Sequence, residues 1–256
     1  MMTVNGSRTR GTTVTMSRSN HERWRSHHPM QEQRDASPSL LDRREAIAEL
    51  GDALRDLVEQ AVRTEAPADE LRQVTADLRR AARPLAVHER EGLRTPSADD
   101  LLGGVRMYNP VTGVGSALAP PLRIDLVDGV AIGACTLGSA FEGPPTYAHG
   151  GVSAQLLDQL LGYVASATGS AGMTVRLETR YHAPIPLRTP LHLTARVTAV
   201  DGRKTTAHGV ITTAARPGDL LVEATGAFVA PRPDQSRRLF GAALQRDAID
   251  PSVEYD

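Results

Sequence analysis

The sequence has a single cysteine, Cys135, among its 256 residues, so no disulfide can form within the chain. A reducing, cytoplasmic location is therefore expected. No apolar run approaches the roughly 18 residues of a transmembrane helix, and the first residues lack the apolar core of a signal peptide. Aromatic residues make up only 4 % of the chain, which predicts a core of mainly aliphatic side chains.

A large charge of either sign is also absent. The formal net charge is −1 at pH 7, so no long-range field would attract nucleic acid or an anionic membrane, and neither partner is expected. The 40 % hydrophobic and 23 % charged residues are ordinary for a globular protein. The sequence contains no phosphate-binding loop, dinucleotide-binding fingerprint or metal-ligand spacing, so neither a cofactor nor a metal is expected.

What is present divides the chain into segments. In chain order we expect a disordered leader (1–40), a helical hairpin (41–84), an irregular linker or arm (85–117), a β-rich domain (118–231) and a loose tail (232–256). The hairpin is expected because apolar residues recur every three or four positions, with Pro67 between the two helices and Pro84 after the second. Two short helices cannot form a core alone, so the hairpin must dock on another surface.

The second half of the chain has the pattern of an antiparallel β-sheet. From about residue 122 the apolar period changes from about 3.6 to about 2, and Asp128-Gly129 and Asp201-Gly202 mark tight hairpins. With one helix expected at 149–167, the order β-β-α-β-β-β-β predicts an α+β fold in which a curved sheet wraps around that helix. Such a helix must be apolar on nearly all sides, as are Val152, Leu156, Leu157, Leu160, Leu161 and Val164.

The stretch YAHGGVSAQLLDQLLG at 147–162 combines two features that a buried helix ordinarily lacks. Gly150 and Gly151 leave the first backbone N–H groups uncovered, where they can bind an anion or a developing oxyanion. An equally good interpretation is that the two glycines allow a tight strand-to-helix turn and have no role in binding. Asp158 is a carboxylate in an apolar helix, where an acid is rare unless it is paired or functional. The structural alternative is an aspartate that bonds a buried hydroxyl or water.

The spacing of Gly151 and Asp158 suggests a dimer. Seven residues are close to two helical turns, so both residues lie on one face, about 10 Å apart along the axis. An aspartate cannot span that distance, but an antiparallel second copy of the helix brings Asp158 of one chain to Gly151 of the other. His149 can orient a carbonyl or brace the loop. Thr174, on the next strand, can hold water, and the alternation leaves open which face of the strand it occupies.

Two longer stretches, FEGPPTYAHGGVSAQLLDQLLG and MTVRLETRYHAPIPLRTPLHLTARVTAVDGRK, resemble the hotdog-fold acyl-CoA thioesterases. They are most similar to the PaaI-like branch that includes human thioesterase superfamily members 4 and 5. The shared order is EGPP, HGG, six residues, Asp, a strand Thr, then Tyr, PIPL and a GRK hairpin. The resemblance covers roughly 118–231 and implies a homodimer, or a dimer of dimers, that hydrolyses acyl-CoA.

Carried over residue by residue, the resemblance makes Asp158 the catalytic carboxylate, acting as general base on water or as nucleophile on the thioester. The Gly151 N–H becomes the oxyanion donor, with His149 and Gly150 shaping the loop. Thr174, from the partner chain, is expected to position the attacking water.

Coenzyme A counts as part of the substrate, so no separate cofactor is expected. The resemblance places its contacts on Arg180, His182, Arg203 and Lys204. The relatives carry two basic residues directly after the Tyr, where this chain has His182-Ala183. Arg180 and Arg188 are candidates to replace them.

Three other functions fit the residues less well. A non-catalytic hotdog module that binds acyl-CoA or a protein partner could carry the same motifs. A hydratase of this fold needs an Asp and a His together on the catalytic segment, and no His follows Asp158 before His182. A serine hydrolase needs G-x-S-x-G, whereas Ser153 lies in GVSAQ.

Overall fold

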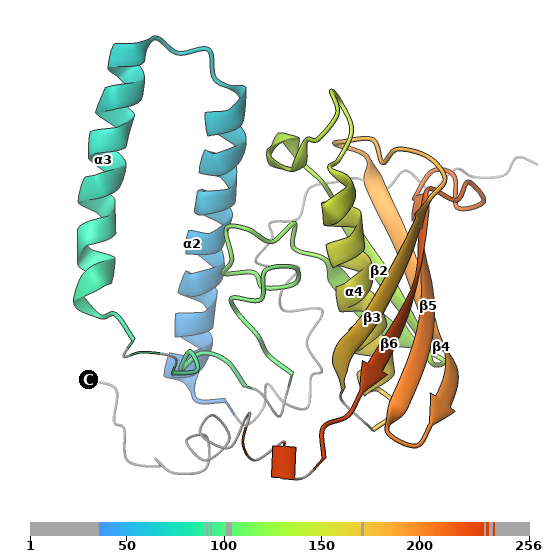
Figure 1. Ribbon diagram of the computed structural model, residues 1–256. Coiled ribbons are helices and arrows are strands. Elements are labelled where there is room, and N and C mark those ends of the chain that lie inside the picture. Colours follow the sequence, from blue (N-terminus) through green and yellow to red (C-terminus); the bar gives the residue numbers. More distant parts are fainter. Residues whose placement is uncertain are drawn as a thin grey trace, which may run out of the picture.

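A computed structural model describes residues 36–238 except 91, 93, 101–103, 170–171, 233, 236 and 237 (Figure 1). Most of the expected leader and tail lies outside these residues. The helices and strands are α2 (Pro38–Arg63), α3 (Ala68–Val87), β1 (Arg123–Val127), β2 (Val130–Thr136), the short 3-10 helix η2 (Ser139–Phe141), α4 (Gly150–Ser166), β3 (Met173–Tyr181), β4 (Pro190–Asp201), β5 (Lys204–Thr213) and β6 (Val222–Val229).

The six strands form one antiparallel sheet in the order β1-β2-β4-β5-β6-β3, which curves around α4. The expected α+β fold of the hotdog type is thereby confirmed. Asp128 and Gly129, with φ of 50° and 77°, form the two-residue turn between β1 and β2. The β4–β5 turn lies one residue later than expected, because Asp201 already pairs with Lys204 and the turn residues are Gly202 and Arg203.

The core lies between α4 and the concave face of the sheet. Helix α4 contacts β2, β3, β4, β5 and β6, so it must be apolar on several sides. Its fully buried apolar side chains are Leu156, Leu157, Leu160, Leu161 and Val164, as the sequence predicts, and Val152 is half-buried. The strands contribute aliphatic side chains such as Leu191, Leu193 and Ile211. The scarcity of aromatic residues is consistent with this aliphatic core.

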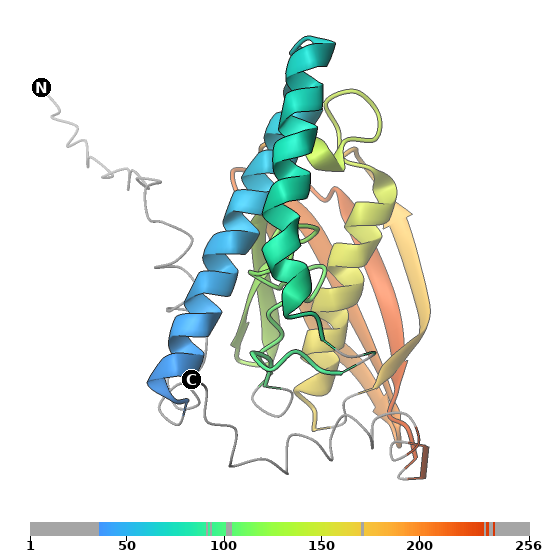
Figure 2. The same ribbon diagram turned by 90° about the vertical axis from the view of Figure 1, so that its left-hand side faces the viewer.

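The N-terminal hairpin lies on the side of α4 that faces away from the sheet (Figures 1 and 2). Helix α2 docks there on the arm, the irregular segment 88–122 between α3 and β1. Arg44 Nε donates to the Ala98 carbonyl over 2.8 Å, and Arg55 donates to the carbonyls of Val114 and Ser116 over 2.8 and 2.7 Å. These guanidinium contacts fix α2 to the backbone of the arm.

The far end of α2 is held to the β-domain by Glu59. Its carboxylate accepts the Ser139 N–H over 2.7 Å and lies 3.2 Å from Arg188 Nη2. Burial acts to raise the pKa of Glu59, but the hydrogen bonds of Ser139 and the charge of Arg188 outweigh it and hold the pKa below its usual value. Arg188 is therefore engaged with α2.

Two helix boundaries differ from those expected. Helix α2 begins at Pro38, inside the expected leader, because Ser37 caps the N–H of Leu40 over 3.2 Å and proline suits a first helical position. Helix α3 continues past Pro84 to Val87. Pro84 lies in the last turn, where a missing N–H costs the helix one backbone hydrogen bond before it stops. Among the described residues, no helix has both the length and the apolarity to cross a membrane.

Replacing Gly51 with Ala is expected to lower the melting temperature, although Ala is the better helix former by about 1 kcal/mol. An added Cβ would overlap the carbonyl oxygen of Val114 and lie 2.7 Å from Gly115 Cα, so α2 would have to lift off the arm. Gly162→Ala in α4 is the matched control, because its Cβ would meet nothing closer than the Phe228 ring at 3.4 Å. Thermal melts of both variants test this; equal melting temperatures would contradict it.

Candidate active site

Asp158 and Thr174 meet on one side of α4. The Thr174 hydroxyl donates to Asp158 Oδ1 over 2.9 Å, and the carboxylate itself is half-buried. No hydrogen bond to the second oxygen, Oδ2, is found among the described residues. Both residues belong to the same chain, so the expectation that Thr174 comes from the partner chain is wrong. The pair presents a half-buried carboxylate with one oxygen held by the Thr174 hydroxyl.

A β-bulge aims Thr174 at the helix. The register of β3 against β6 shifts between Thr174 and Arg176, so that Val175 is an extra residue in the strand. Thr174 lies opposite Phe228, whose side chain is in the core, and faces α4. Strict alternation would have put Thr174 and Leu177 on opposite faces, but the bulge puts both on the inner face. The sequence carries no alternation signal for such an insertion.

The entrance of α4 is capped by His149. Its Nδ1 accepts the Gly151 N–H over 3.0 Å, and its carbonyl accepts the Val152 N–H over 3.0 Å. An acceptor at Nδ1 places the proton of the neutral ring on Nε2, which is a donor. The Gly151 N–H expected to bind the oxyanion is thus already bonded to His149. No acceptor for the Gly150 N–H is found among the described residues.

Tyr181 ties the other end of β3 to this entrance. Its hydroxyl donates to the Gly150 carbonyl over 3.0 Å, and its ring would contact a Cβ added at Gly150 at 3.4 Å. The sequence marks this Tyr as part of the shared motif but gives it no role. A hollow of about 320 Å³ adjoins it, lined among others by Ser153 and His182. One strand therefore carries both contacts: Thr174 to Asp158 near its start and Tyr181 to Gly150 at its end.

Within one chain, the entrance of α4 and the Asp158–Thr174 pair are separate. Gly151 and Asp158 lie on one helix, seven residues or about 10 Å apart along its axis. Both residues lie within the continuous helix α4, so helix geometry predicts that Asp158 cannot reach a carbonyl bound at its own helix entrance. His149 and Gly151 are exposed at that entrance.

The side chains expected to bind coenzyme A divide into two groups. Arg180 and His182 surround Glu223: His182 Nε2 lies 3.0 Å and Arg180 Nη1 3.6 Å from Glu223 Oε1, and His208 Nε2 lies 3.2 Å from Oε2. Hydrogen bonds with His182 and then His208 hold the pKa of Glu223 below its usual value. An anionic ligand would compete with Glu223 for Arg180 and the two histidines.

The second group lies at the other end of the sheet. Lys204 pairs with Val229, and Arg203 donates to the Ala230 carbonyl over 2.6 Å. Glu223 and Val229 are six residues apart on β6, which corresponds to about 20 Å at the usual rise of a strand. A single chain therefore keeps the two expected contact groups apart.

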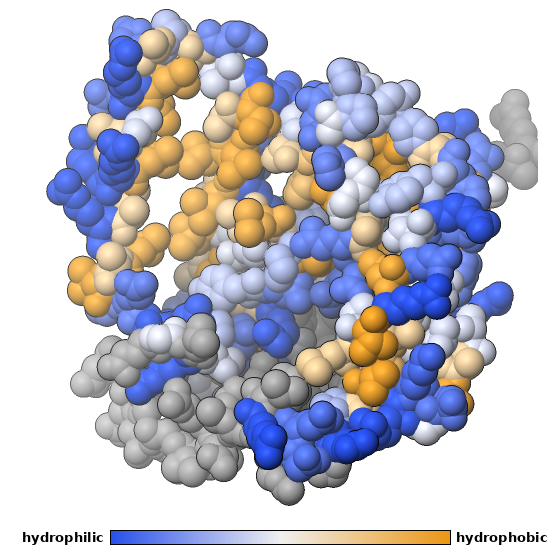
Figure 3. Space-filling view, viewed as in Figure 1, coloured by the Kyte–Doolittle hydropathy of each residue, from blue (hydrophilic) through white to orange (hydrophobic). Residues whose placement is uncertain are grey.

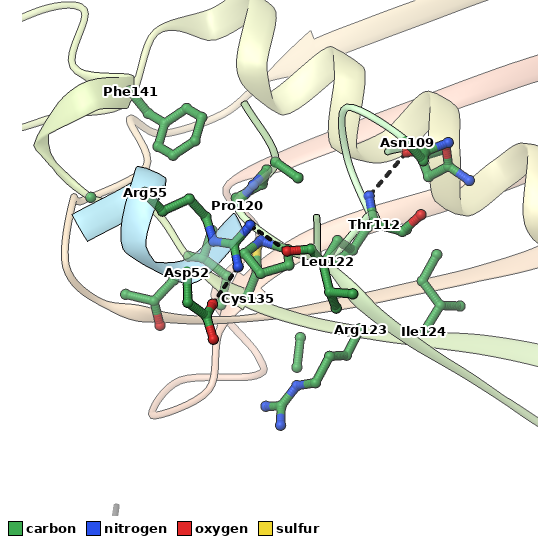
Figure 4. A pocket seen from close by; sticks show the side chains of 18 of the residues that line it. Asp52, Arg55, Asn109, Thr112, Pro120, Leu122, Arg123, Ile124, Cys135 and Phe141 are labelled. Carbon is green, nitrogen blue, oxygen red and sulfur yellow. Dashed lines mark hydrogen bonds and ion pairs between the residues drawn. The ribbon is translucent and has the colours of Figure 1, made fainter. Parts of the chain in front are cut away.

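A cavity of about 790 Å³ lies elsewhere, between α2, the arm and the β1–β2 side of the sheet (Figure 4). Arg55, paired with Asp52, and Phe141 belong to its wall, whereas Asp158 and Thr174 do not. Cys135 also lines it, but burial raises the pKa of this thiol to about 12, so it stays protonated and is no nucleophile. Among the described residues no group of three potential metal ligands occurs.

The known proteins to which this chain is similar are thioesterases. The family model "Thioesterase superfamily" matches residues 146–224, which include α4 and the strands up to the start of β6. Acyl-coenzyme A thioesterase THEM4 of Xenopus laevis is 36 % identical over 67 residues, which are 26 % of this chain and 30 % of that protein. THEM4 of Bos taurus is 32 % identical over 102 residues, 39 % and 40 % of the two chains. The chain thus spans less than half the length of these relatives.

A crystal structure of a thioesterase superfamily protein extends the likeness to more of the chain. It is 40 % identical with a TM-score of 0.64, and the match covers 72 % of this chain and 94 % of the other. The matched part of the chain is therefore longer than the β-domain alone. This match, together with the family model, shows that the chain belongs to the thioesterase superfamily.

Proposed function

We propose that the protein hydrolyses acyl-CoA thioesters to a free acid and coenzyme A. The observation that carries this proposal is the hydrogen bond that fixes Asp158 Oδ1 against Thr174, whereas no hydrogen bond to Oδ2 is found among the described residues. A carboxylate so held can act on water or on a carbonyl carbon. Membership of the thioesterase superfamily and the names of the THEM4 relatives support the substrate class.

The working unit in this proposal is a homodimer joined along β3. This strand ends the sheet, so one row of its backbone groups has no strand partner among the described residues. Its side chains are largely exposed, including Met173 at 47 %, Val175 at 61 % and Tyr181 at 54 %. Such an edge is a template for a further strand. A second β3, antiparallel to the first, would cover it and extend one sheet across both chains.

Antiparallel pairing of β3 would also complete two active sites. Thr174, with Asp158, lies near the start of β3, and Tyr181, with Gly150, lies at its end. A two-fold axis near the middle of the strand brings the start of one β3 beside the end of the other. Asp158 of one chain would then face the α4 entrance of its partner. The spacing within α4 and the contacts of β3 lead to the same arrangement independently.

The reaction would proceed by attack at the thioester carbonyl carbon. Asp158, oriented by Thr174, accepts a proton from water as the hydroxide adds to the carbon, or attacks it directly to give an anhydride that water opens. The carbonyl oxygen becomes an oxyanion, which the N–H groups and dipole at the partner's α4 entrance stabilise. The C–S bond then breaks, and the departing thiolate of coenzyme A receives, through Asp158, a proton of the water that is consumed. The products are R–COOH and CoA–SH.

His149 would control this entrance. Its Nδ1 holds the Gly151 N–H in the structure, whereas the Gly150 N–H has no acceptor among the described residues. In the proposed mechanism the Gly150 N–H meets the carbonyl oxygen first, and the Gly151 N–H joins it as the His149 ring turns away.

Coenzyme A would span the two chains. In the proposed dimer, the Met173 end of β3 in one chain adjoins the Arg180 end of β3 in the other. Lys204 lies on β5, two strands from the β3 edge and level with Met173. It would therefore approach His182 of the other chain. The phosphates would displace Glu223 from Arg180 and His182. No cofactor takes part in this scheme, and the reducing cytoplasm stays the expected location for a chain whose only thiol, Cys135, is buried.

Release of coenzyme A from a panel of short, medium, long and aryl acyl-CoAs tests the function. Turnover is expected for at least one class, and the panel then gives the acyl preference. The alternative, a binding module without catalysis, is favoured by one observation, namely the Gly151 N–H that already has an acceptor. Binding of acyl-CoAs without any turnover would support that alternative and remove the hydrolase.

A further inference from the structure

The peptide group between Gly150 and Gly151 carries one of the N–H donors at the α4 entrance. Its nitrogen end is the Gly151 N–H, and its carbonyl end is the Gly150 oxygen. Because a trans peptide is planar, these two groups point in opposite directions, so a contact that holds the oxygen also aims the N–H. The glycine on either side has no Cβ to restrict the rotation of this peptide. The direction of the Gly151 N–H therefore depends strongly on the contacts of the peptide.

Side chains hold this peptide at both ends. The Tyr181 hydroxyl donates to the Gly150 oxygen over 3.0 Å, and a carbonyl oxygen has a second lone pair for the helical N–H four residues on. At the other end, His149 Nδ1 accepts the Gly151 N–H over 3.0 Å. The hydroxyl, the peptide and the imidazole thus form one chain of hydrogen bonds. A donor at the carbonyl also polarises the peptide and makes its N–H a stronger donor.

The position of the Tyr181 hydroxyl is set by the sheet. Tyr181 pairs with Val222 of β6, which is buried in the core. The tyrosine ring lies beside the bare side of Gly150, where an added Cβ would be 3.4 Å from Cε1 and 3.6 Å from the hydroxyl oxygen. The helix entrance is therefore held from a strand that does not belong to the helix.

We propose that Tyr181 is a positioning residue for the hydrolysis. It holds the Gly150–Gly151 peptide, so that the Gly151 N–H stays aimed at the oxyanion once the His149 ring turns away. In the structure the imidazole occupies this N–H, and the Tyr181 bond at the opposite end of the peptide persists when the imidazole leaves. This inference rests on the proposed function, because only an oxyanion at the entrance requires the N–H in this direction.

The expected effect is modest, because the Tyr181–Gly150 hydrogen bond is exposed to water. The surface around the upper end of α4, where the entrance lies, is mostly hydrophilic or of intermediate hydropathy, whereas apolar side chains gather over α2 and α3 (Figure 3). Loss of the hydroxyl should lower kcat about tenfold, as for one hydrogen bond. KM should stay unchanged, because the bond acts on a donor that is used in the transition state.

Tyr181→Phe tests the kinetic effect, since it removes the hydroxyl and keeps the ring beside Gly150. Tyr108→Phe, on the arm, is the matched control, because Tyr108 is 44 % exposed and no hydrogen bond of its hydroxyl is found among the described residues. Coenzyme A release should show the loss of kcat in Tyr181→Phe alone. The melting temperature and sedimentation of both variants should stay close to those of the unchanged chain, which separates positioning from a role in folding or assembly.

Nuclear magnetic resonance tests the hold on the peptide without any turnover. Gly-Gly occurs only twice in the sequence, at 103–104 and 150–151. In a full chain that carries glycine labelled with carbonyl ¹³C and with ¹⁵N, only these two peptides join the two labels, so a spectrum that correlates them shows two signals. The 150–151 signal should move in Tyr181→Phe and keep its place in Tyr108→Phe, with the 103–104 signal as the internal reference.

Two results would overturn the role of Tyr181. A 150–151 signal that does not move in Tyr181→Phe would show that the hydroxyl does not hold the peptide. A signal that moves while kcat stays unchanged would show that the hold has no part in the reaction. Absence of turnover by the unchanged chain would instead remove the proposed hydrolysis, and the 150–151 signal would still decide whether Tyr181 holds this peptide.

Discussion

Asp158→Asn is expected to lower kcat for acyl-CoA hydrolysis at least about a hundredfold, the lower range of what a general base contributes. The amide keeps the shape of the carboxylate, and its oxygen can still accept the Thr174 hydroxyl, so the fold and the Asp158–Thr174 contact persist. What is lost is the ability to accept a proton from water or to attack carbon. The loss should therefore appear in kcat far more than in KM.

The control for this variant is Asp125→Asn. Asp125 is exposed on β1, on the outer face of the sheet and on the opposite edge from β3. The Asp125→Asn substitution removes the same negative charge without a contact to the candidate active site. The prediction is tested by measuring coenzyme A release by both variants and by the unchanged chain, with thermal melts to check that each is folded. An Asp158→Asn enzyme that keeps more than about a tenth of its kcat would exclude a general-base or nucleophile role.

Val175→Lys is expected to separate the proposed dimer and to remove hydrolysis with it. Val175 is 61 % exposed at the β3 bulge, so lysine is tolerated in the isolated chain. In the dimer each lysine would lie in the interface between the two β3 strands, where edge lysines oppose pairing. Each active site needs one half from each of the two chains. The activity per chain should therefore fall at least about a hundredfold, as for loss of an oxyanion site.

Analytical ultracentrifugation beside the coenzyme A assay measures both effects. The variant should sediment as a single chain of 27.4 kDa, without a complete site. Val200→Lys is the matched control, since Val200 is 57 % exposed near the far end of β4. Full activity in a single-chain species would contradict the shared site, and an unchanged assembly would place the interface away from β3.

The sequence predicted those parts of the fold that follow from local rules. Asp128-Gly129 predicts its turn because positive φ values suit these residues, and the apolar sides of the central helix predict the sheet around it. The seven-residue spacing of Gly151 and Asp158 predicts their separation, because helix geometry alone fixes it. The resemblance added what spacing could not, namely the class of reaction.

Other features depend on tertiary contacts that periodicity does not encode. The bulge at Val175 inverts the alternation, so the face of Thr174 could not be read from its neighbours. The His149 ring turns back on the Gly151 N–H, a choice that a histidine before two glycines leaves open. Pro84 was expected to end α3, but a proline in a final turn is tolerated.

Complementation between two inactive chains tests the shared site most directly. Asp158→Asn removes one half, and Gly151→Asp would place a carboxylate at the helix entrance, where it suits the helix dipole but repels an oxyanion. Each variant alone should be inactive. Co-expressed chains that pair at random should recover up to about a quarter of the unchanged activity, because half of the dimers contain one intact site. If mixed dimers form and no activity returns, both halves of the site belong to one chain, and the account is wrong.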